Sequence, residues 1–294
     1  MSFPTLVPPA RLAVIGDPIK HSKSPQMHNP ALRARGINAQ YVRVQVPVGR
    51  VAEAFRAFAA AGFLGINITI PHKFEALDAV DVLDPLAQQL GAVNTVHIRE
   101  GKLHGFNSDG PGFLRSVHEA FGKNVSDLRV LVLGAGGGAG RAVAVQSALV
   151  CCKRLVLVNR TQSKADQLMD DLSTLAITQS ITKEVSVIPW NDEALRAELP
   201  EIDLIVNGTS LGMKPDDAPL LPPRVLRSSH IVFDMVYKAG VSTQLSMAAQ
   251  SSGAGYVDGR TLLLHQGAIS FEHWFGGTAP MEEMRAGLQA ALHP

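Results

Sequence analysis

The sequence contains very little cysteine: Cys151 and Cys152 are the only two among 294 residues, and they are adjacent. Adjacent cysteines match neither the disulfide framework of a small secreted domain nor the ligand spacing of a zinc site. We therefore interpret them as two small residues buried near the end of a helix, rather than as a redox pair.

Long hydrophobic runs are lacking as well. No apolar stretch reaches the roughly 18 residues that a membrane-spanning helix needs, and the segment MSFPTLVPPA lacks the charged and apolar parts of a signal peptide. Charge of one sign is also missing, since 27 Lys and Arg residues nearly balance 26 Asp and Glu residues. We expect a cytoplasmic protein that acts on a small molecule, without a nucleic-acid or membrane partner.

The first third of the chain alternates strand-like and helix-like segments. Val51, Ala54, Phe55 and Phe58 recur at helical spacing, and Gly62 suits the end of that helix. Such alternation predicts a mostly parallel sheet that is covered on both faces. The expected strands are Leu12–Ile15, Tyr41–Val46, Gly65–Ile68 and Val93–His97.

The rest of the chain, from about Asp127 onward, predicts a second sheet of the doubly wound kind. The expected strands are Arg129–Gly134, Leu155–Val158, Val185–Ile188, Leu204–Val206, Ile231–Phe233 and Gly255–Val257. The C-terminal segments TLLLHQGAISFEHWF and MEEMRAGLQAAL have helical patterns and are candidates for packing back on the first domain. A chain of 294 residues has room for two domains of about 100–200 residues each.

A glycine-rich turn follows the first strand of this second segment. It has the spacing Gly134-x-Gly136-x-x-Ala139, with a strand before it and a helix after it. Glycine is needed there for the tight turn, for backbone approach to a pyrophosphate and for close packing of the helix on the strand. We predict a dinucleotide site, the alternative being a merely glycine-rich turn.

The end of the next strand indicates which dinucleotide is bound. An NAD site usually has Asp or Glu about 20 residues after the turn, bonded to the ribose 2′-hydroxyl. Here Asn159, Arg160 and Thr161 occupy that place, Lys164 follows, and no carboxylate comes before Asp166. Cations suit a 2′-phosphate, which Arg can bind with two hydrogen bonds. We predict NADP, with NAD as the alternative cofactor and an exposed basic turn as the alternative to a site.

Three polar residues of the first domain are candidates for a site. Pro71 suits the first position of a helix, which places Lys73 in the first turn, where the helix dipole disfavours its charge. That placement suggests a functional lysine, the alternative being an ordinary surface residue. Asp109 is expected to cap the following helix. Asn94 lies in an apolar strand, where it either bonds to backbone or lines a pocket.

The loop GDPIKHSKSPQMHN, from Gly16 to Asn29, holds many hydrogen-bond donors directly after the first strand. The i, i+2 spacing of Ser22 and Ser24 in an extended loop would project both hydroxyls the same way. Metal binding is not expected, because the histidines of this domain lack ligand spacing. They are His21, His28 and His72.

The motifs resemble, in their order, those of the shikimate dehydrogenase family, which includes the quinate/shikimate subtype. They are GDPIKHSKSPQMHN, GINITIPHK, GAVNT, GFNSDG, GAGGGAGRA, NRT, NGTSLGM, DMVY and DGRTLLLHQGA, and they run from about Leu12 to about Trp274. The resemblance implies an NADP-linked oxidoreductase that interconverts 3-dehydroshikimate and shikimate in chorismate biosynthesis. It also implies an α/β fold with an N-terminal substrate domain, residues 1–112 and 245–294, and a Rossmann-type NADP domain, residues 113–244.

The resemblance further implies a role for each matching residue. Ser22 and Ser24 would bind the substrate carboxylate, and Tyr237 would help to orient it. Ring hydroxyls would be held by Thr69, Asn94, Asp109 and Gln266. The residues at the cofactor would be Gly134, Gly136, Gly137, Gly138, Ala139, Asn159, Arg160, Thr161, Lys164, Thr209, Met213, Met235 and Gly259.

Lys73 and Asp109 match the catalytic pair of the family. An alcohol that loses a hydride must also lose a proton, so a base or relay has to contact its oxygen. A cation such as Lys73 can stabilise the charge that develops on that oxygen. Asp109 would pair with Lys73 and fix its position.

Departures from the family pattern leave alternatives open. The glycine turn is one residue longer than the common form, which leaves the register of Gly138, Ala139 and Gly140 on the phosphates undecided. Ser108 stands where threonine is usual. The alternatives are a quinate/shikimate dehydrogenase of broader substrate and cofactor use and a non-catalytic NADP-binding regulator. We expect a monomer or a homodimer.

Overall fold

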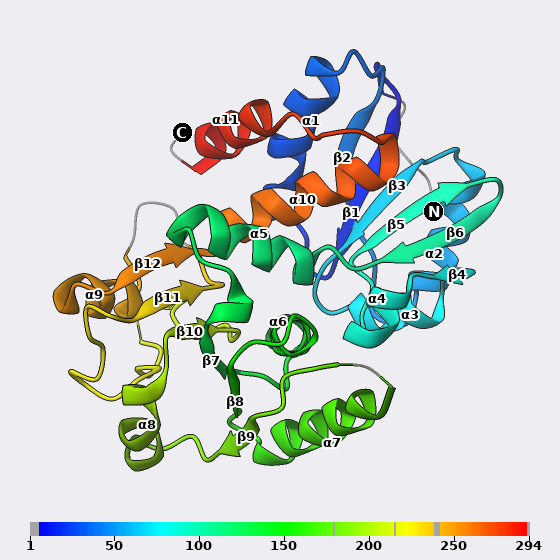
Figure 1. The fold of residues 1–294 in the computed structure, drawn as a ribbon. Helices are drawn as coiled ribbons and strands as arrows, with labels where there is room; N and C mark the ends of the chain where they lie inside the picture. The colour runs from blue at the N-terminus through cyan, green and yellow to red at the C-terminus, as the bar shows by residue number, and fades with distance from the viewer. Residues whose placement is uncertain (1–5, 179, 215, 238–241, 293–294) are drawn as a thin grey trace. The chain divides into compact units, whose positions relative to one another are not determined.

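The computed structural model of the protein describes residues 6–178, 180–214, 216–237 and 242–292. The chain divides into two compact units, residues 1–112 with 263–294 and residues 113–262. Each unit is built around its own six-stranded sheet (Figure 1). The second unit extends beyond the boundary expected at residue 245, because a helix and an edge strand of its sheet follow that position.

The first unit has a mixed sheet with the strand order β2-β1-β3-β5-β6-β4. Its elements are β1 (Ala10–Gly16), α1 (Ser24–Ala34), β2 (Gln40–Gln45), α2 (Val51–Ala60), β3 (Gly65–Ile68), α3 (Lys73–Asp78), β4 (Val82–Leu83), α4 (Pro85–Leu90), β5 (Thr95–Arg99), β6 (Lys102–Phe106) and the start of α5 (Asp109–Phe121). β1 pairs in parallel with β2 and β3, whereas β5 pairs antiparallel with β3 and β6.

The antiparallel part of this sheet differs from the sequence prediction. Strands lie at three of the four expected places, but the fourth begins at Thr95 rather than Val93, and β4 and β6 were not expected. The two-residue turn at Glu100 and Gly101, with φ values of 52° and 73°, joins β5 directly to β6. Because two positive φ values match the twist of a hairpin, the chain turns back there instead of crossing over through a helix.

Helix α2 has the buried face that the sequence predicts. Val51, Ala54, Phe55 and Phe58 are at most 1% exposed and pack in the core of the first unit. Gly62 follows the helix with a φ of 74°, a conformation that glycine adopts without steric cost. The start of α2 is held by Glu75 of α3, whose carboxylate accepts a hydrogen bond from the Val51 amide at 2.8 Å.

The second unit has an all-parallel sheet with the strand order β12-β11-β10-β7-β8-β9. Its elements are the rest of α5, η1 (Val125–Asp127), β7 (Arg129–Leu133), α6 (Gly138–Leu149), β8 (Arg154–Val158), α7 (Gln162–Thr178), β9 (Val185–Ile188), α8 (Asp192–Glu198), η2 (Leu199–Glu201), β10 (Leu204–Asn207), β11 (Ile231–Asp234), α9 (Gln244–Ser252), β12 (Gly255–Asp258) and the start of α10 (Gly259–Phe275). This is the doubly wound order of dinucleotide-binding folds, so that prediction is confirmed. Chain order reverses between β7 and β10, where such sheets bind their ligands.

The C-terminal helices contribute to the first unit from Leu263 onward. In α10, the Trp274 indole donates a hydrogen bond to the Val96 carbonyl of β5 at 2.9 Å. Helix α11 (Met281–Leu292) packs against α1 (Figure 1). Gly287 permits this close packing, because a Cβ at that position would lie 2.2 Å from the Gln26 carbonyl oxygen.

The two cysteines lie just beyond α6 and differ in exposure. Cys152 is 2% exposed, as predicted, and burial raises the pKa of its thiol to about 11. Cys151 is exposed, so its predicted burial is wrong. Its positive φ of 56° belongs to the turn that ends the helix.

His28 of α1 is buried among aromatic rings. Its ring stacks on Tyr41 with centroids 4.4 Å apart, and Trp274 lies 5.4 Å away. Neither ring nitrogen has a hydrogen-bond partner among the described residues. Burial lowers the pKa of His28 from 6.5 to about 3, so the imidazole is neutral in the folded protein.

We predict that His28 makes the fold sensitive to acid. The unfolded chain binds a proton at this residue near pH 6.5 and the folded chain only near pH 3. Stability is therefore fully present above about pH 6.5 and decreases as the pH falls toward 3, by about 2 kcal/mol between pH 7 and pH 5. Urea unfolding should show that the free energy of unfolding of His28→Phe does not fall by this amount between pH 7 and pH 5. His118→Phe, at an exposed position, is the control, and an equal pH dependence of His28→Phe and wild type would contradict the account.

Candidate active site

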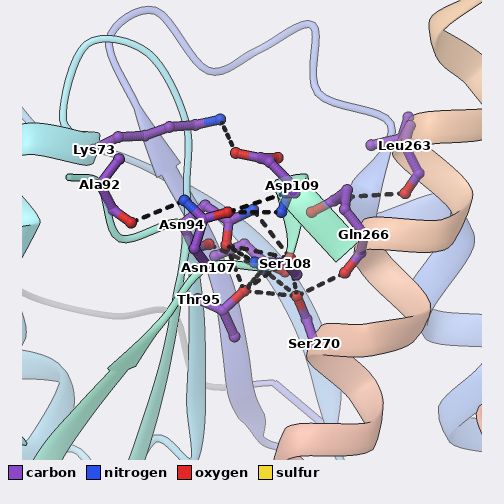
Figure 2. Close-up of polar contacts among 12 residues, drawn as sticks. Lys73, Ala92, Asn94, Thr95, Asn107, Ser108, Asp109, Leu263, Gln266 and Ser270 are labelled. Carbon is purple, nitrogen blue, oxygen red and sulfur yellow. Dashed lines mark hydrogen bonds and ion pairs between the residues drawn. The ribbon is translucent and has the colours of Figure 1, made fainter. Parts of the chain in front are cut away.

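An ion pair between Lys73 and Asp109 is the centre of the site in the first unit. The Lys73 Nζ lies 2.6 Å from Asp109 Oδ2, and the two side chains are 13% and 9% exposed. Lys73 is the first residue of α3 and Asp109 the first of α5, and their charged ends point toward each other (Figure 2). An ammonium group has three donors, and Asp109 uses one of them, so the others can reach a bound hydroxyl.

The features that place Lys73 and Asp109 at the starts of their helices differ from those that the sequence suggested. Helix α3 begins at Lys73 rather than at Pro71, because the His72 amide closes a turn on the Thr69 carbonyl at 3.0 Å. Asp109 does not cap α5. The side chain of Asn107 accepts hydrogen bonds from the amides of Asp109 and Gly110 at 2.9 and 3.3 Å, which leaves the Asp109 carboxylate for Lys73.

A buried polar network lies beside the ion pair (Figure 2). Asn94 accepts a hydrogen bond from the Ser108 amide at 2.8 Å and donates one to the Ser108 hydroxyl at 3.0 Å. The hydroxyls of Thr95 and Ser270 lie 2.7 Å apart, and each lies 3.2 Å from that of Ser108. Asn94 was expected either to bond to backbone or to line a pocket, and the structure shows the bond to backbone. Its contact with a substrate hydroxyl stays a prediction.

Sequence reasoning missed Asn67 and Ser270 as members of this network. Asn67 donates to the Ser270 hydroxyl at 2.8 Å and accepts from the Tyr41 hydroxyl at 2.7 Å. Two signals were present: a polar residue inside the apolar strand GINI, and a serine one helical turn after Gln266. A buried polar side chain within an apolar pattern needs a partner.

Gln266 and Thr69 belong to the same unit, Gln266 within α10 and Thr69 directly after β3. The Gln266 side chain donates a hydrogen bond to the Leu263 carbonyl at 2.8 Å, and the Gln266 backbone carbonyl accepts one from the Ser270 hydroxyl at 2.9 Å (Figure 2). Gly112 of α5 contacts the Gln266 backbone, since a Cβ there would lie 2.9 Å from its nitrogen. Thr69 directly follows β3, and its amide bonds to the Ile15 carbonyl of β1 at 3.0 Å.

Ser22 and Ser24 converge at the start of α1. Their hydroxyl oxygens lie 3.1 Å apart, and the Ser22 hydroxyl also accepts a hydrogen bond from the Ser24 amide at 3.3 Å. Ser24 is the first residue of the helix, so the expectation of an extended loop is wrong for this residue. The helix has no acidic residue in its first turn, which leaves its positive end available to an anion.

In the second unit, the glycine turn assigns the close-packing role to Gly140 rather than to Ala139. A Cβ on Gly140 would lie 2.2 Å from the Gly134 carbonyl oxygen. Gly134 has a φ of 80°, and Gly137 precedes α6, which starts at Gly138. The longer turn thus shifts the third glycine by one residue. Gly140 was not among the predicted cofactor residues, although its spacing from Gly134 was visible in the sequence.

The end of β8 lies against this turn. The Asn159 side chain accepts a hydrogen bond from the Gly136 amide at 3.3 Å and donates one to the Thr161 carbonyl at 2.8 Å. A Cβ on Gly136 would lie 2.4 Å from that of Lys164. Arg160 and Lys164 are exposed, and within the described chain neither forms a salt bridge. Two cations that form no salt bridge within the described residues, beside a glycine turn, could bind the phosphate groups of a dinucleotide.

A fully buried carboxylate organises the other half of this sheet edge. Asp234, at the end of β11, accepts hydrogen bonds from the side chains of Asn207, Thr243 and Tyr256 at 2.8, 3.0 and 3.1 Å. Burial raises the pKa of this carboxyl group. Asn207 in turn accepts the Thr209 hydroxyl at 2.7 Å, so Asp234 fixes the loop after β10.

Three of the remaining predicted cofactor residues lie on loops of this unit, namely Thr209, Met213 and Met235, and Gly259 is the first residue of α10. Met213 is 56% exposed, which excludes a core position for it. Met235 directly follows β11, and Gly259 permits close approach to it, because a Cβ there would lie 2.2 Å from the Met235 carbonyl oxygen. Tyr237 contacts Gly259, and burial together with Asp258 raises the pKa of its hydroxyl.

The close contact of Gly140 gives a test of this register. Gly140→Ala would place a methyl group against the Gly134 backbone and should lower the free energy of unfolding by about 2–4 kcal/mol. Gly137→Ala is the matched control, since its Cβ would lie 3.4 Å from the same carbonyl oxygen, and it should cost about 1 kcal/mol or less. Urea denaturation measures both. Equal losses in the two variants would refute the assignment of the packing role to Gly140.

The described residues contain no group of three or more His, Cys, Asp or Glu side chains placed to hold a metal ion. His72 instead bonds through Nε2 to the Val46 carbonyl at 2.7 Å. None of the helices in the described ranges is long and apolar enough to cross a membrane.

Two family models match segments that lie mostly in the first unit, and relatives match nearly the whole chain. The shikimate dehydrogenase substrate binding domain matches residues 14–96, and the shikimate 5′-dehydrogenase C-terminal domain matches residues 259–289. The shikimate dehydrogenase (NADP(+)) of Symbiobacterium thermophilum is 41% identical over 283 residues, which cover 96% of this chain and 94% of that protein.

Solved structures extend the likeness to the fold. Shikimate 5-dehydrogenase from Thermus thermophilus, in complex with NADP(H) and shikimate, is 33% identical with a TM-score of 0.83 and covers 96% of this chain and 99% of its own. Quinate dehydrogenase from Corynebacterium glutamicum, in complex with NAD, is 28% identical with a TM-score of 0.84 and covers 96% and 99%. On the sequence identity and coverage together, the chain belongs to the shikimate dehydrogenase family.

Proposed function

We propose that the protein is an NADP-dependent shikimate dehydrogenase that reversibly reduces 3-dehydroshikimate to shikimate. The observation that carries the proposal is the Lys73–Asp109 pair at 2.6 Å, held at the starts of two helices beside a polar network. The curated relatives have this activity in their names. The glycine turn and the cations after β8 supply the features that a dinucleotide needs.

The chemistry assigned to the pair is proton transfer. When shikimate is oxidised, the reacting carbon loses a hydride and its hydroxyl loses a proton. NADP⁺, when bound, accepts the hydride. Lys73 takes the hydroxyl proton while it passes one of its own protons to the Asp109 carboxylate, and its charge stabilises the oxygen during the step. In the reduction, the same protons move in reverse and the carbonyl oxygen becomes a hydroxyl.

Substrate binding is assigned to residues of the first unit. Ser22 and Ser24 would donate hydrogen bonds from their hydroxyl groups to the carboxylate. The distance of 3.1 Å between their hydroxyl oxygens supports this role. Thr69, Asn94 and Gln266 would hold ring hydroxyls. Tyr237, in the second unit, would help to orient the acid.

Cofactor binding is assigned to the second unit. The amides at the start of α6, beside Gly137 and Gly138, would bind the pyrophosphate. Arg160 and Lys164 would bind the 2′-phosphate that distinguishes NADP from NAD. Asn159 would brace the turn between them, as its bond to the Gly136 amide supports. Thr161, Thr209, Met213, Met235 and Gly259 would line the rest of the site.

Two alternatives remain to be weighed against this proposal. A broader quinate/shikimate dehydrogenase is favoured by the likeness to a quinate dehydrogenase in complex with NAD. A non-catalytic regulator is disfavoured, because a sensor would not need the Lys73–Asp109 pair. We further propose a reducing, cytoplasmic location, supported by the two unpaired cysteines, and a monomer or homodimer.

The proposed function is tested by steady-state rates with shikimate and quinate, each with NADP⁺ and NAD⁺. We expect the highest kcat/KM for shikimate with NADP⁺. The reason is that two cations follow β8, in place of the carboxylate that binds the ribose 2′-hydroxyl of NAD. A preference for NADP⁺ of about 100-fold or more would fit loss of charge-assisted phosphate contacts. A quinate rate far above the shikimate rate would favour the broader enzyme, and no rate with either acid would refute the proposal.

A further inference from the structure

Arg43 of β2 holds the loop that carries the serine pair. Its Nε donates a hydrogen bond to the Ser22 carbonyl at 2.7 Å, and its Nη2 donates one to the Gln26 side chain at 2.6 Å. The guanidinium is thus fixed at two points, one on the loop and one on α1. A fork of this kind restricts the arginine to one position, unlike a flexible lysine.

The charge of Arg43 is not balanced by a carboxylate. Among the described residues no acid forms a salt bridge with it, and partial burial lowers the pKa of its guanidinium. The nearby Asp17 instead accepts a hydrogen bond from Gln45 at 2.8 Å. The partly buried Arg141 and Arg154 have acidic partners, Asp171 and Glu198, whereas the partly buried Arg11 donates to the backbone carbonyls of Ala61 and Gly62.

The other cations of the first unit are less suited to meet an anion at the serine pair. Lys73 is neutralised by Asp109. Lys20 is exposed, and an exposed ammonium group contributes little, since water and salt screen it. Lys23 is partly buried, but no hydrogen bond within the described residues fixes its flexible side chain. The hydroxyls of Ser22 and Ser24 donate hydrogen bonds but carry no charge.

We propose that Arg43 is a positioning residue that supplies the positive charge for the substrate carboxylate and holds Ser22 where its hydroxyl meets that group. The inference rests on the proposed function and extends it. It states that the site selects a carboxylate by charge as well as by hydrogen bonds. A half-buried charge acts over several ångströms with less screening than one on the surface.

The test compares shikimate with its uncharged methyl ester in wild type and Arg43→Gln, at saturating NADP⁺, as substrates or as competitive inhibitors. We expect Arg43→Gln to raise the KM for shikimate about tenfold. The KM or inhibition constant for the ester should rise less than about threefold. The kcat and the KM for NADP⁺ should stay within about twofold, because Arg43 forms no hydrogen bond with Lys73 or Asp109 and belongs to the unit that is assigned to the substrate. An equal rise for both ligands, or no rise for shikimate, would overturn the proposal.

Two further variants keep the test decisive. Arg43→Lys retains the charge but not the two-point fork, so its KM for shikimate should rise by less than the tenfold expected for Arg43→Gln. A rise of about tenfold or more in Arg43→Lys would overturn the charge role, even if Arg43→Gln does not fold. Arg33→Gln removes an exposed cation near the other end of α1 and should change neither constant. Absence of shikimate oxidation by the wild type would refute the proposed function itself, which distinguishes the two failures.

Discussion

The ion pair of Lys73 and Asp109 is the interaction on which the account of this protein depends. Both residues begin helices, and the backbone around them is fixed, because the Val93 amide bonds to the Lys73 carbonyl at 3.0 Å and Asn107 holds the Asp109 amide. The pair is shielded but not closed off, at 13% and 9% exposure. A charge that is shielded from water but still reachable acts strongly on a bound hydroxyl.

Two arginines assigned to ligands, Arg43 and Arg160, differ in charge balance from arginines that stabilise the fold. Arg129 is bound to Asp203 at 2.9 Å and contributes to the fold of its unit. Arg43 and Arg160 have no acidic partner among the described residues. An uncompensated cation favours an anion, whether a carboxylate or a phosphate. Each unit thus presents a cation to the anionic group of the ligand that we assign to it.

Much of the fold could be predicted from the sequence, because apolar periodicity fixes strands and helices such as β3 and α2. The hairpin of β5 and β6 could not be predicted, because the sequence Glu100-Gly101 is not a strong turn signal. Only the positive φ values of both residues reveal the turn. The pairing of Lys73 with Asp109 came from family resemblance and not from the pattern of residues. The role of Gly140 and the network through Ser270 depend on packing between distant segments, which periodicity does not encode.

The most direct test of the central claim is single-turnover oxidation of shikimate by Lys73→Ala, with NADP⁺ binding measured on the same protein. Loss of the proton relay should reduce the rate of the chemical step by at least about 100-fold, while the dissociation constant for NADP⁺ stays within about threefold. Lys102→Ala, on an exposed strand position, should leave both unchanged. A Lys73→Ala rate close to that of the wild type would contradict the account.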